Sequence, residues 1–233
     1  MGYAIAPEDL AISNDSLRFL NAKAIASPAG IVELSEGDVR LLIVNVNRRA
    51  LESTLGADLI YINEKTSSFV LVQYKTMRDV LDEQPVFRPG SDANVQRELA
   101  RMRAVEPGED DGLPGSFRLD PQAGYLKLCS PVVRLRQLDT RPVSGMYLPL
   151  ALWDAILKTP QARGPKGGLA IGYHNAGRYL TNTQFAELVR GGWIGTRTSS
   201  TNELTELVLD GLDAGRSVTV AAASGVDPAR IPR

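Results

Sequence analysis

Two short apolar stretches separated by a polar turn are the clearest feature of the hydrophobic pattern. The first covers residues 59–62 and the second covers 69–72, and both are rich in β-branched and aromatic residues. The residues Asn63-Glu64-Lys65 between them are polar and typical of a turn. The segment therefore predicts a β-hairpin, whose antiparallel pairing sets the start of the first strand beside the end of the second.

The rest of the chain alternates further apolar runs with segments of helical periodicity. The run Arg40–Val46 is either a strand or the start of a helix, because a short apolar run does not decide between them. Thr181-x-x-Gln184 and Ser200-x-x-Glu203 have the form of capping boxes. Helices are expected at 17–26, 48–55 (ended by Gly56), 92–105 (capped by Asp92), 150–158, 183–190 and 204–212. Further strands are expected at 116–119, 124–129 and 217–222.

This order of elements predicts an α/β fold with a mixed sheet flanked by helices. A chain of 233 residues suffices for one good-sized domain, or for a core plus a smaller appendage. The loop at 106–115, rich in Gly, Pro and acidic residues, is the best internal boundary. We expect an N-terminal extension over residues 1–36, a core over 37–143 and a basic C-terminal region over 144–233.

Composition narrows the class of protein. No run approaches about 18 apolar residues, so no membrane-spanning helix is expected. The N-terminus also lacks the pattern of a signal peptide. Cys129 is the only cysteine and is expected in a buried strand, which excludes an internal disulfide and a cysteine-based zinc cluster. His174 is the only histidine, so we interpret it as a structural or phosphate-facing residue rather than a catalyst. A soluble, cytoplasmic protein without a membrane partner is expected.

The overall net charge of −1 hides an asymmetry along the chain. Residues 1–111 carry a net charge of −6, residues 112–200 a net +7, and residues 201–233 a net −2. An acidic part followed by a basic part suits a protein that acts on a polyanion. The alternative is that these charges intermix in the folded chain and form no patch.

Three polar side chains are predicted to converge at the edge of the hairpin. Asp58 opens its first strand, and Gln73-x-Lys75 closes its second. Gln73 and Lys75 are two residues apart and therefore share a face of the sheet. A carboxylate, an amide oxygen and an ammonium group suit metal-assisted hydrolysis of a phosphodiester. The alternative is that Asp58 caps the turn after Gly56, while Gln73 and Lys75 are ordinary residues at a strand end.

With Asp58, Gln73 and Lys75 at this spacing, the chain resembles the PD-(D/E)XK nuclease superfamily in its Gln-x-Lys, Mrr-like variant. The resemblance implies a restriction-endonuclease-like core with a C-terminal α/β extension. It also implies Mg²⁺ or Mn²⁺ held by Asp58 and Gln73, with Lys75 orienting the attacking water. Members of the superfamily often add a glutamate from a preceding helix, and Glu52 is the best candidate. Ala57 stands where the superfamily usually has proline.

The activity that follows from this resemblance is metal-dependent cleavage of DNA, in bacterial defence or DNA processing, with RNA not excluded. Arg97, Arg101, Arg163 and Lys166 are the candidate contacts to the nucleic-acid backbone, while Trp193 is expected in the core. Whether the chain acts alone or as a homodimer stays open. Two other readings remain: a non-catalytic nucleic-acid-binding or assembly module, and a small-molecule sensor or protein-interaction domain.

Overall fold

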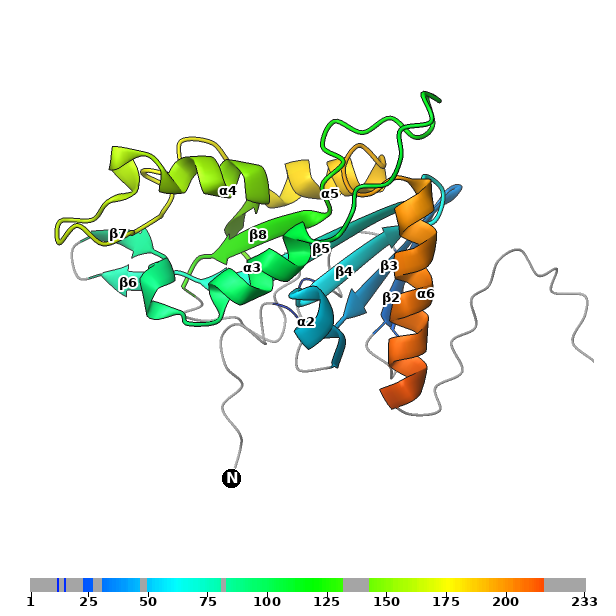
Figure 1. Ribbon diagram of the computed structural model, residues 1–233, viewed down its shortest axis with the longest axis horizontal. Helices are drawn as coiled ribbons and strands as arrows, with labels where there is room; N and C mark the ends of the chain where they lie inside the picture. Colours follow the sequence, from blue (N-terminus) through cyan, green and yellow to red (C-terminus); the bar gives the residue numbers. More distant parts are fainter. Residues whose placement is uncertain are drawn as a thin grey trace, which may run out of the picture.

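The centre of the molecule is one mixed β-sheet of seven strands in the order β1-β2-β3-β4-β5-β8-β9 (Figure 1). This computed structural model describes Ile12, Asp15 and residues 23–26, 31–46, 50–80, 83–131 and 143–215. The strands are β1 Lys23–Ala26, β2 Ile31–Glu36, β3 Val39–Asn45, β4 Leu59–Asn63, β5 Ser68–Thr76, β8 Gly124–Cys129 and β9 Gly145–Pro149.

Neighbouring strands of the sheet are antiparallel except at one position. β5 and β8 run parallel, and parallel neighbours need a long crossover between them. The crossover contains a small hairpin of β6 (Arg78–Val80) and β7 (Glu83–Val86), a short 3-10 helix (Pro89–Ser91) and helix α3 (Val95–Arg103). The crossover therefore brings α3 back over the sheet beside β5 and β8.

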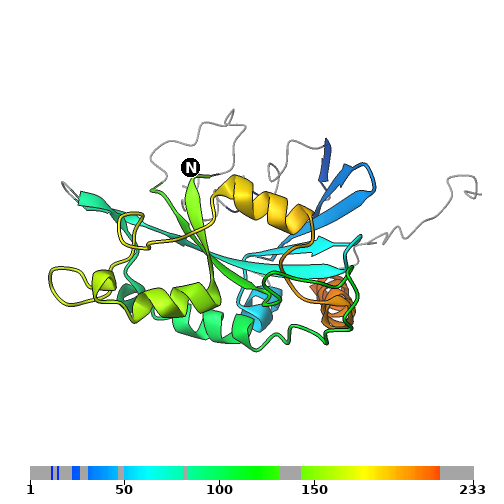
Figure 2. The ribbon, with the colours of Figure 1, turned by 90° about the horizontal axis from the view of Figure 1, so that it is seen from above.

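Helices cover both faces of the sheet and make three layers, seen edge-on in Figure 2. On one face lie α3 together with α2 (Ala50–Leu55), α4 (Leu150–Leu157) and α6 (Thr198–Gly215). On the other face lies α5 (Asn182–Arg190). The predicted α/β fold with a mixed sheet flanked by helices is confirmed.

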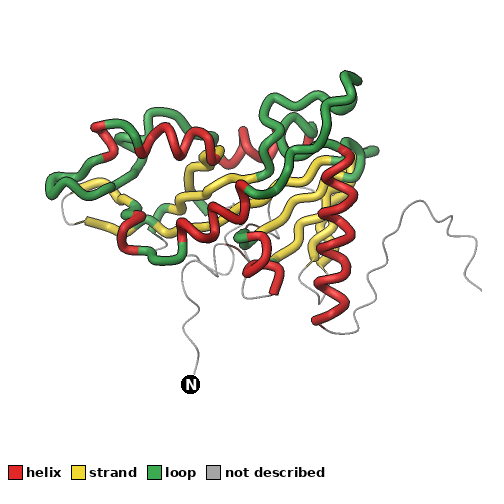
Figure 3. Tube along the Cα trace, in the orientation of Figure 1, coloured by secondary structure: helices red, strands yellow, loops and turns green. Residues whose placement is uncertain are grey.

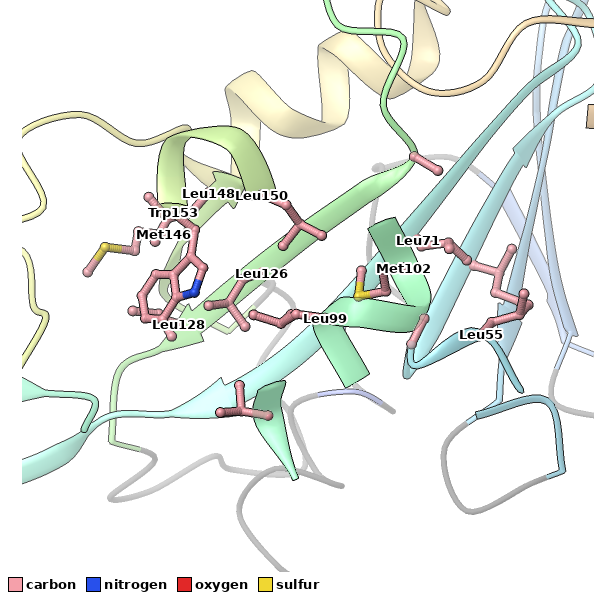
Figure 4. Close-up of a cluster of buried hydrophobic side chains, with 14 of the residues drawn as sticks. Leu55, Leu71, Leu99, Met102, Leu126, Leu128, Met146, Leu148, Leu150 and Trp153 are labelled. Carbon is pink, nitrogen blue, oxygen red and sulfur yellow. The ribbon is translucent and has the colours of Figure 1, made fainter. Parts of the chain in front are cut away.

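Strand β5 is buried on both faces, and its side chains alternate between two hydrophobic cores. Phe69 and Leu71 join the core beneath α3 and α4, whereas Val70 and Val72 join the core beneath α5. Figure 4 shows the first core, in which Trp153 of α4 packs among leucines and methionines from the sheet and from α3. In a strand enclosed in this way, a buried polar side chain without a partner is energetically costly.

Several sequence-based expectations are confirmed. The hairpin forms from β4 and β5. The run Arg40–Val46, left open between strand and helix, is a strand as far as Asn45 in β3. Gly56 follows α2 with a left-handed φ of 72°, as a C-terminal stop requires. Helix α5 begins with the capping box of Thr181, and Cys129 is buried at the end of β8.

Three expectations about elements are wrong. Residues 23–26, expected in a helix, form β1, because pairing with the edge of β2 overrides the helix preference of their alanines. Residues 116–119 form no strand, since the buried Arg118 guanidinium bonds backbone carbonyls and holds this segment in a loop. Figure 3 shows that loop rising above the sheet between α3 and β8. Helix α6 starts at Thr198, so the expected capping residues at 200–203 lie inside it.

Residues 143–215 share both cores with the rest of the sheet. β9 is paired with β8, α4 packs in the first core and α5 in the second. The strand expected at 217–222 lies outside the described residues. Among the described residues, no helix has the length and apolar character needed to cross a membrane.

Candidate functional site

Asp58 lies at the entry to β4, between two neighbouring strands. Its backbone carbonyl accepts the N–H of Val46 at 2.9 Å, and its own N–H donates to the carbonyl of Val72 at 2.9 Å. The side chain is buried, and its Oδ2 accepts the backbone N–H of Tyr74 at 2.7 Å. The carboxylate is thus fixed against β5 by a charge-assisted hydrogen bond.

Gln73 and Lys75 share the face of the sheet on which Asp58 lies. Leu59 pairs with Val72, and the antiparallel register continued by one residue sets Asp58 beside Gln73. The Nε2 of Gln73 donates to the carbonyl of Tyr74 at 3.4 Å. Its Oε1 is buried and has no hydrogen-bond partner among the described residues. A buried acceptor left without a partner costs about 1–3 kcal/mol, so it is a natural place for a bound cation or water.

Lys75 is held by two acidic side chains. Its Nζ lies 3.0 Å from Oδ2 of Asp92 and 2.7 Å from Oε2 of Glu98, and its side chain is only 8% exposed. An ammonium group this well buried needs such partners, because isolated burial of a charge is strongly unfavourable. Asp92 and Glu98 therefore fix the direction of the Lys75 ammonium group.

The start of α3 positions both acids. The Oδ1 of Asp92 accepts the backbone N–H groups of Asn94 at 2.9 Å and Val95 at 3.2 Å, so Asp92 fixes the turn that leads into α3. The N-cap of α3 is Asn94, so the expectation that Asp92 caps the helix is wrong. Burial acts to raise the pKa of Asp92, but these hydrogen bonds and the Lys75 ammonium outweigh it and hold that pKa below its usual value. Gly56 allows α3 to approach closely, since a Cβ there would lie 2.2 Å from the carbonyl oxygen of Glu98.

Glu98 and the site role of Asp92 were missed by sequence reasoning, although a signal for Glu98 was present. Glu98 falls between Val95 and Met102 in the stripe of residues that α3 buries. A carboxylate in an apolar stripe needs a buried cation, and Lys75 provides it. Glu52, the acid proposed from the sequence, is half-buried on α2, and the acids 3.0 and 2.7 Å from the Lys75 ammonium are Asp92 and Glu98.

The four basic residues proposed to contact nucleic acid lie in two places. Arg97 and Arg101 are exposed one turn apart on α3, and Arg97 donates to the side chain of Asn94. Arg163 and Lys166 are exposed in the loop that follows α4. All four side chains are therefore accessible.

The fit of a divalent cation depends on Asp58 and Gln73. Among the described residues, no group of three or more His, Cys, Asp or Glu side chains is arranged to hold a metal ion. However, the Asp58 carboxylate and the partnerless Oε1 of Gln73 are hard oxygen donors on adjacent strand positions. Mg²⁺ keeps several of its bound waters and therefore needs few protein ligands. These two oxygen donors are of the type that Mg²⁺ prefers.

Tyr74 connects this site to a buried charge cluster on the opposite face. Its hydroxyl donates to Oδ2 of Asp15 at 2.9 Å, and the same carboxylate oxygen pairs with the ammonium of Lys127. The Asp15 and Lys127 side chains are both 0% exposed. Burial, and then the negative charge of Asp15, raise the pKa of Tyr74, so its hydroxyl stays protonated and donates.

Trp193, expected in the core, is 48% exposed, and that expectation is wrong. It follows the Gly191-Gly192 stop of α5, and its ring meets the exposed ring of Phe117 edge-on with centroids 6.5 Å apart. Its backbone carbonyl accepts the N–H of Leu119, which fixes the two loops together.

Comparisons of the chain with models of protein families, with curated proteins and with solved structures give no match.

Proposed function

We propose that the protein is a metal-dependent nuclease that hydrolyses phosphodiester bonds of DNA. The observation that carries the proposal is the convergence of Asp58, Gln73 and Lys75 on one face of two adjacent strands. The partnerless Oε1 of Gln73 supports it, because a buried hard oxygen beside a carboxylate suits a divalent cation. A role in bacterial defence or DNA processing, in the cytoplasm, belongs to the same proposal.

Asp58 and Gln73 would hold Mg²⁺ or Mn²⁺, with Glu52 as a further ligand. When bound, the ion supplies polarisation of the phosphoryl oxygen and a lower pKa for a bound water. Lys75 orients the water and offsets negative charge that develops on the phosphate. Glu98 and Asp92 act as positioning residues, because they fix the Lys75 ammonium by contacts of 2.7 and 3.0 Å.

The proposal is tested by incubating the protein with linear and circular duplex DNA, single-stranded DNA and RNA, each with Mg²⁺ or Mn²⁺. Cleavage of DNA is expected, and Asp58→Asn and Lys75→Met are expected to lower its rate at least 100-fold. Glu203→Gln and Lys158→Met are the matched controls, since both side chains are exposed, and both variants should cut at the unaltered rate. Cleavage that persists undiminished in Asp58→Asn or Lys75→Met refutes the proposal.

A second measurement distinguishes residues that bind the metal from residues that position Lys75. Calorimetric titration with Mn²⁺ should show weaker binding in Asp58→Asn and Glu52→Gln, whereas Glu98→Gln should bind Mn²⁺ normally and cut more slowly. Each variant is first checked for an intact fold by circular dichroism. Normal Mn²⁺ affinity in Asp58→Asn would contradict the ligand assignment.

A second function, a nucleic-acid-binding module without catalysis, is favoured by one observation. Lys75 is engaged by two carboxylates, an arrangement that also serves simply to anchor α3 on β5. Such a module would bind DNA with strong salt dependence and without cleavage under any metal. Its binding would survive Asp58→Asn, which separates it from the nuclease.

A further inference from the structure

A cavity outside the Asp58–Lys75 site opens between β7 and the loop that follows α4. Its volume is about 460 Å³, within the range of about 300–1,000 Å³ that is typical of small-molecule sites. β7 and this loop are joined by mutual backbone hydrogen bonds of Phe87 and Ile171, at 2.7 and 2.9 Å. They lie at the left end of the molecule in Figure 1, where β6 and β7 project.

The lining of the cavity is cationic and polar. Arg88 enters from the segment after β7, Arg163 from the loop after α4, and His174 from the turn beyond it. Gln84 and Gln161 add amide groups. The described residues that line the cavity include no aspartate or glutamate, and no described carboxylate forms an ion pair with Arg88 or Arg163.

The backbone around His174 holds the two sides of the cavity, β7 and the loop after α4, close together. A Cβ at Gly172 would lie 2.4 Å from the carbonyl oxygen of Pro85, so only glycine permits this approach. The side chain of Asn175 accepts the N–H of Gly172 at 2.8 Å and donates to the carbonyls of Gln161 and Ala170. The turn that carries His174 is therefore fixed relative to β7 and to the Arg163 loop.

We propose that this cavity binds the phosphate monoester of a nucleotide, either free or at the end of a strand. Two guanidinium groups without carboxylate partners among the described residues offer N–H donors that match phosphate oxygens. Arg163 gives one donor, from Nη1, to the Gly167 carbonyl at 3.2 Å and has its other N–H groups for the phosphate. A phosphate monoester carries a charge of about −1.5 to −2 at neutral pH, more than a diester, and fits a compact cationic cavity. The free amides of Gln84 and Gln161 suit the sugar or base.

This assignment stands independently of the nuclease proposal. Arg88 is four residues before Asp92, and the short 3-10 helix Pro89–Ser91 joins them, so the cavity adjoins the Lys75 site along the chain. Binding of the phosphate ligands is measured in the Asp58→Asn variant in the presence of EDTA. The result for the cavity therefore does not depend on whether the protein cleaves DNA.

The test is calorimetric titration of the protein with adenosine 5′-monophosphate, adenosine, inorganic phosphate and a 5′-phosphorylated trinucleotide. We expect 1:1 binding of the monophosphate and at least tenfold weaker binding of adenosine, with phosphate as a competitor. Arg88→Ala, Arg163→Ala and His174→Gln should each weaken binding of the monophosphate at least fivefold. Lys158→Ala removes an exposed charge outside the lining and should change it less than twofold.

The relative affinities of the monophosphate and the trinucleotide identify the source of the phosphate. Tighter binding of the trinucleotide assigns the cavity to a strand end, and tighter binding of the monophosphate assigns it to a free nucleotide; both outcomes support the phosphate site. Equal affinity for the monophosphate and adenosine overturns it. Unaltered binding in Arg88→Ala and Arg163→Ala, with the fold verified by circular dichroism, also overturns it.

Discussion

Lys127→Met should destabilise the protein by about 3 kcal/mol, because it leaves a buried negative charge without its cation. The Asp15 and Lys127 side chains are 0% exposed and form an ion pair beneath the sheet. Removing one partner of such a pair typically costs about 3–5 kcal/mol. The lower end applies here, since Asp15 keeps hydrogen bonds from the Tyr74 hydroxyl at 2.9 Å and from the Val143 N–H at 2.7 Å.

This loss is a sizeable fraction of the free energy of unfolding of a typical domain, which is about 5–15 kcal/mol. The assay is urea unfolding followed by circular dichroism, with the slope of the unfolding free energy against urea checked for constancy. Lys158→Met is the matched control, because it makes the same substitution at an exposed site. It should change the free energy of unfolding by no more than about 0.5 kcal/mol.

A double substitution separates charge from packing. Asp15→Asn removes the negative charge while its amide oxygen can still accept from Tyr74 or Val143. Adding Asp15→Asn to Lys127→Met should therefore recover about 1 kcal/mol or more, a coupling within the usual range of about 0.5–3 kcal/mol. A loss below about 1 kcal/mol in Lys127→Met, or further destabilisation by the added Asp15→Asn, would refute the electrostatic reasoning.

Three further changes test other parts of the structure, each by urea unfolding. Gly56→Ala should cost at least about 1–2 kcal/mol, because φ is 72° there and the new Cβ would meet the Glu98 carbonyl; an unchanged midpoint would contradict this. Thr181→Ala should cost about 1 kcal/mol through loss of the capping box of α5, and Thr181→Ser should retain most of that stability. Because the pKa of Asp92 is lowered by folding, its contribution is present above about pH 4 and is lost as pH falls below it. Asp92→Asn should thus be less stable than wild type at pH 7, and the difference in the free energy of unfolding should narrow toward pH 3. A difference that does not change with pH would contradict the role of Lys75.

Local patterns were sufficient to predict the hairpin and most helices. The β4–β5 hairpin follows from two apolar runs around a polar turn, and the start of α5 follows from the spacing of Thr181 and Gln184. These features depend on residues close together in the sequence, so their physics is local. The start of α6 and the loop around Arg118 depend on hydrogen bonds to distant backbone groups and could not be predicted in this way.

The candidate site was predictable only in its strand residues. Asp58, Gln73 and Lys75 follow from hairpin register, whereas the acids that hold Lys75 come from the turn before α3 and from α3, 17 and 23 residues further along. Their approach depends on Gly56 allowing α3 to pack closely, a contact between elements that no periodicity reveals. The exposure of Trp193 likewise depends on how two loops meet.

Strand β5 makes the site dependent on the opposite face of the sheet. Tyr74 lies between Gln73 and Lys75, and its side chain points away from theirs toward Asp15 and Lys127. Its N–H binds the Asp58 carboxylate, and its carbonyl accepts the Gln73 amide. A shift of Tyr74 therefore moves a donor and an acceptor of the site together. Since the Asp15 hydrogen bond and the Lys127 ammonium near its ring fix Tyr74, loss of that cluster should loosen the site even where the fold persists.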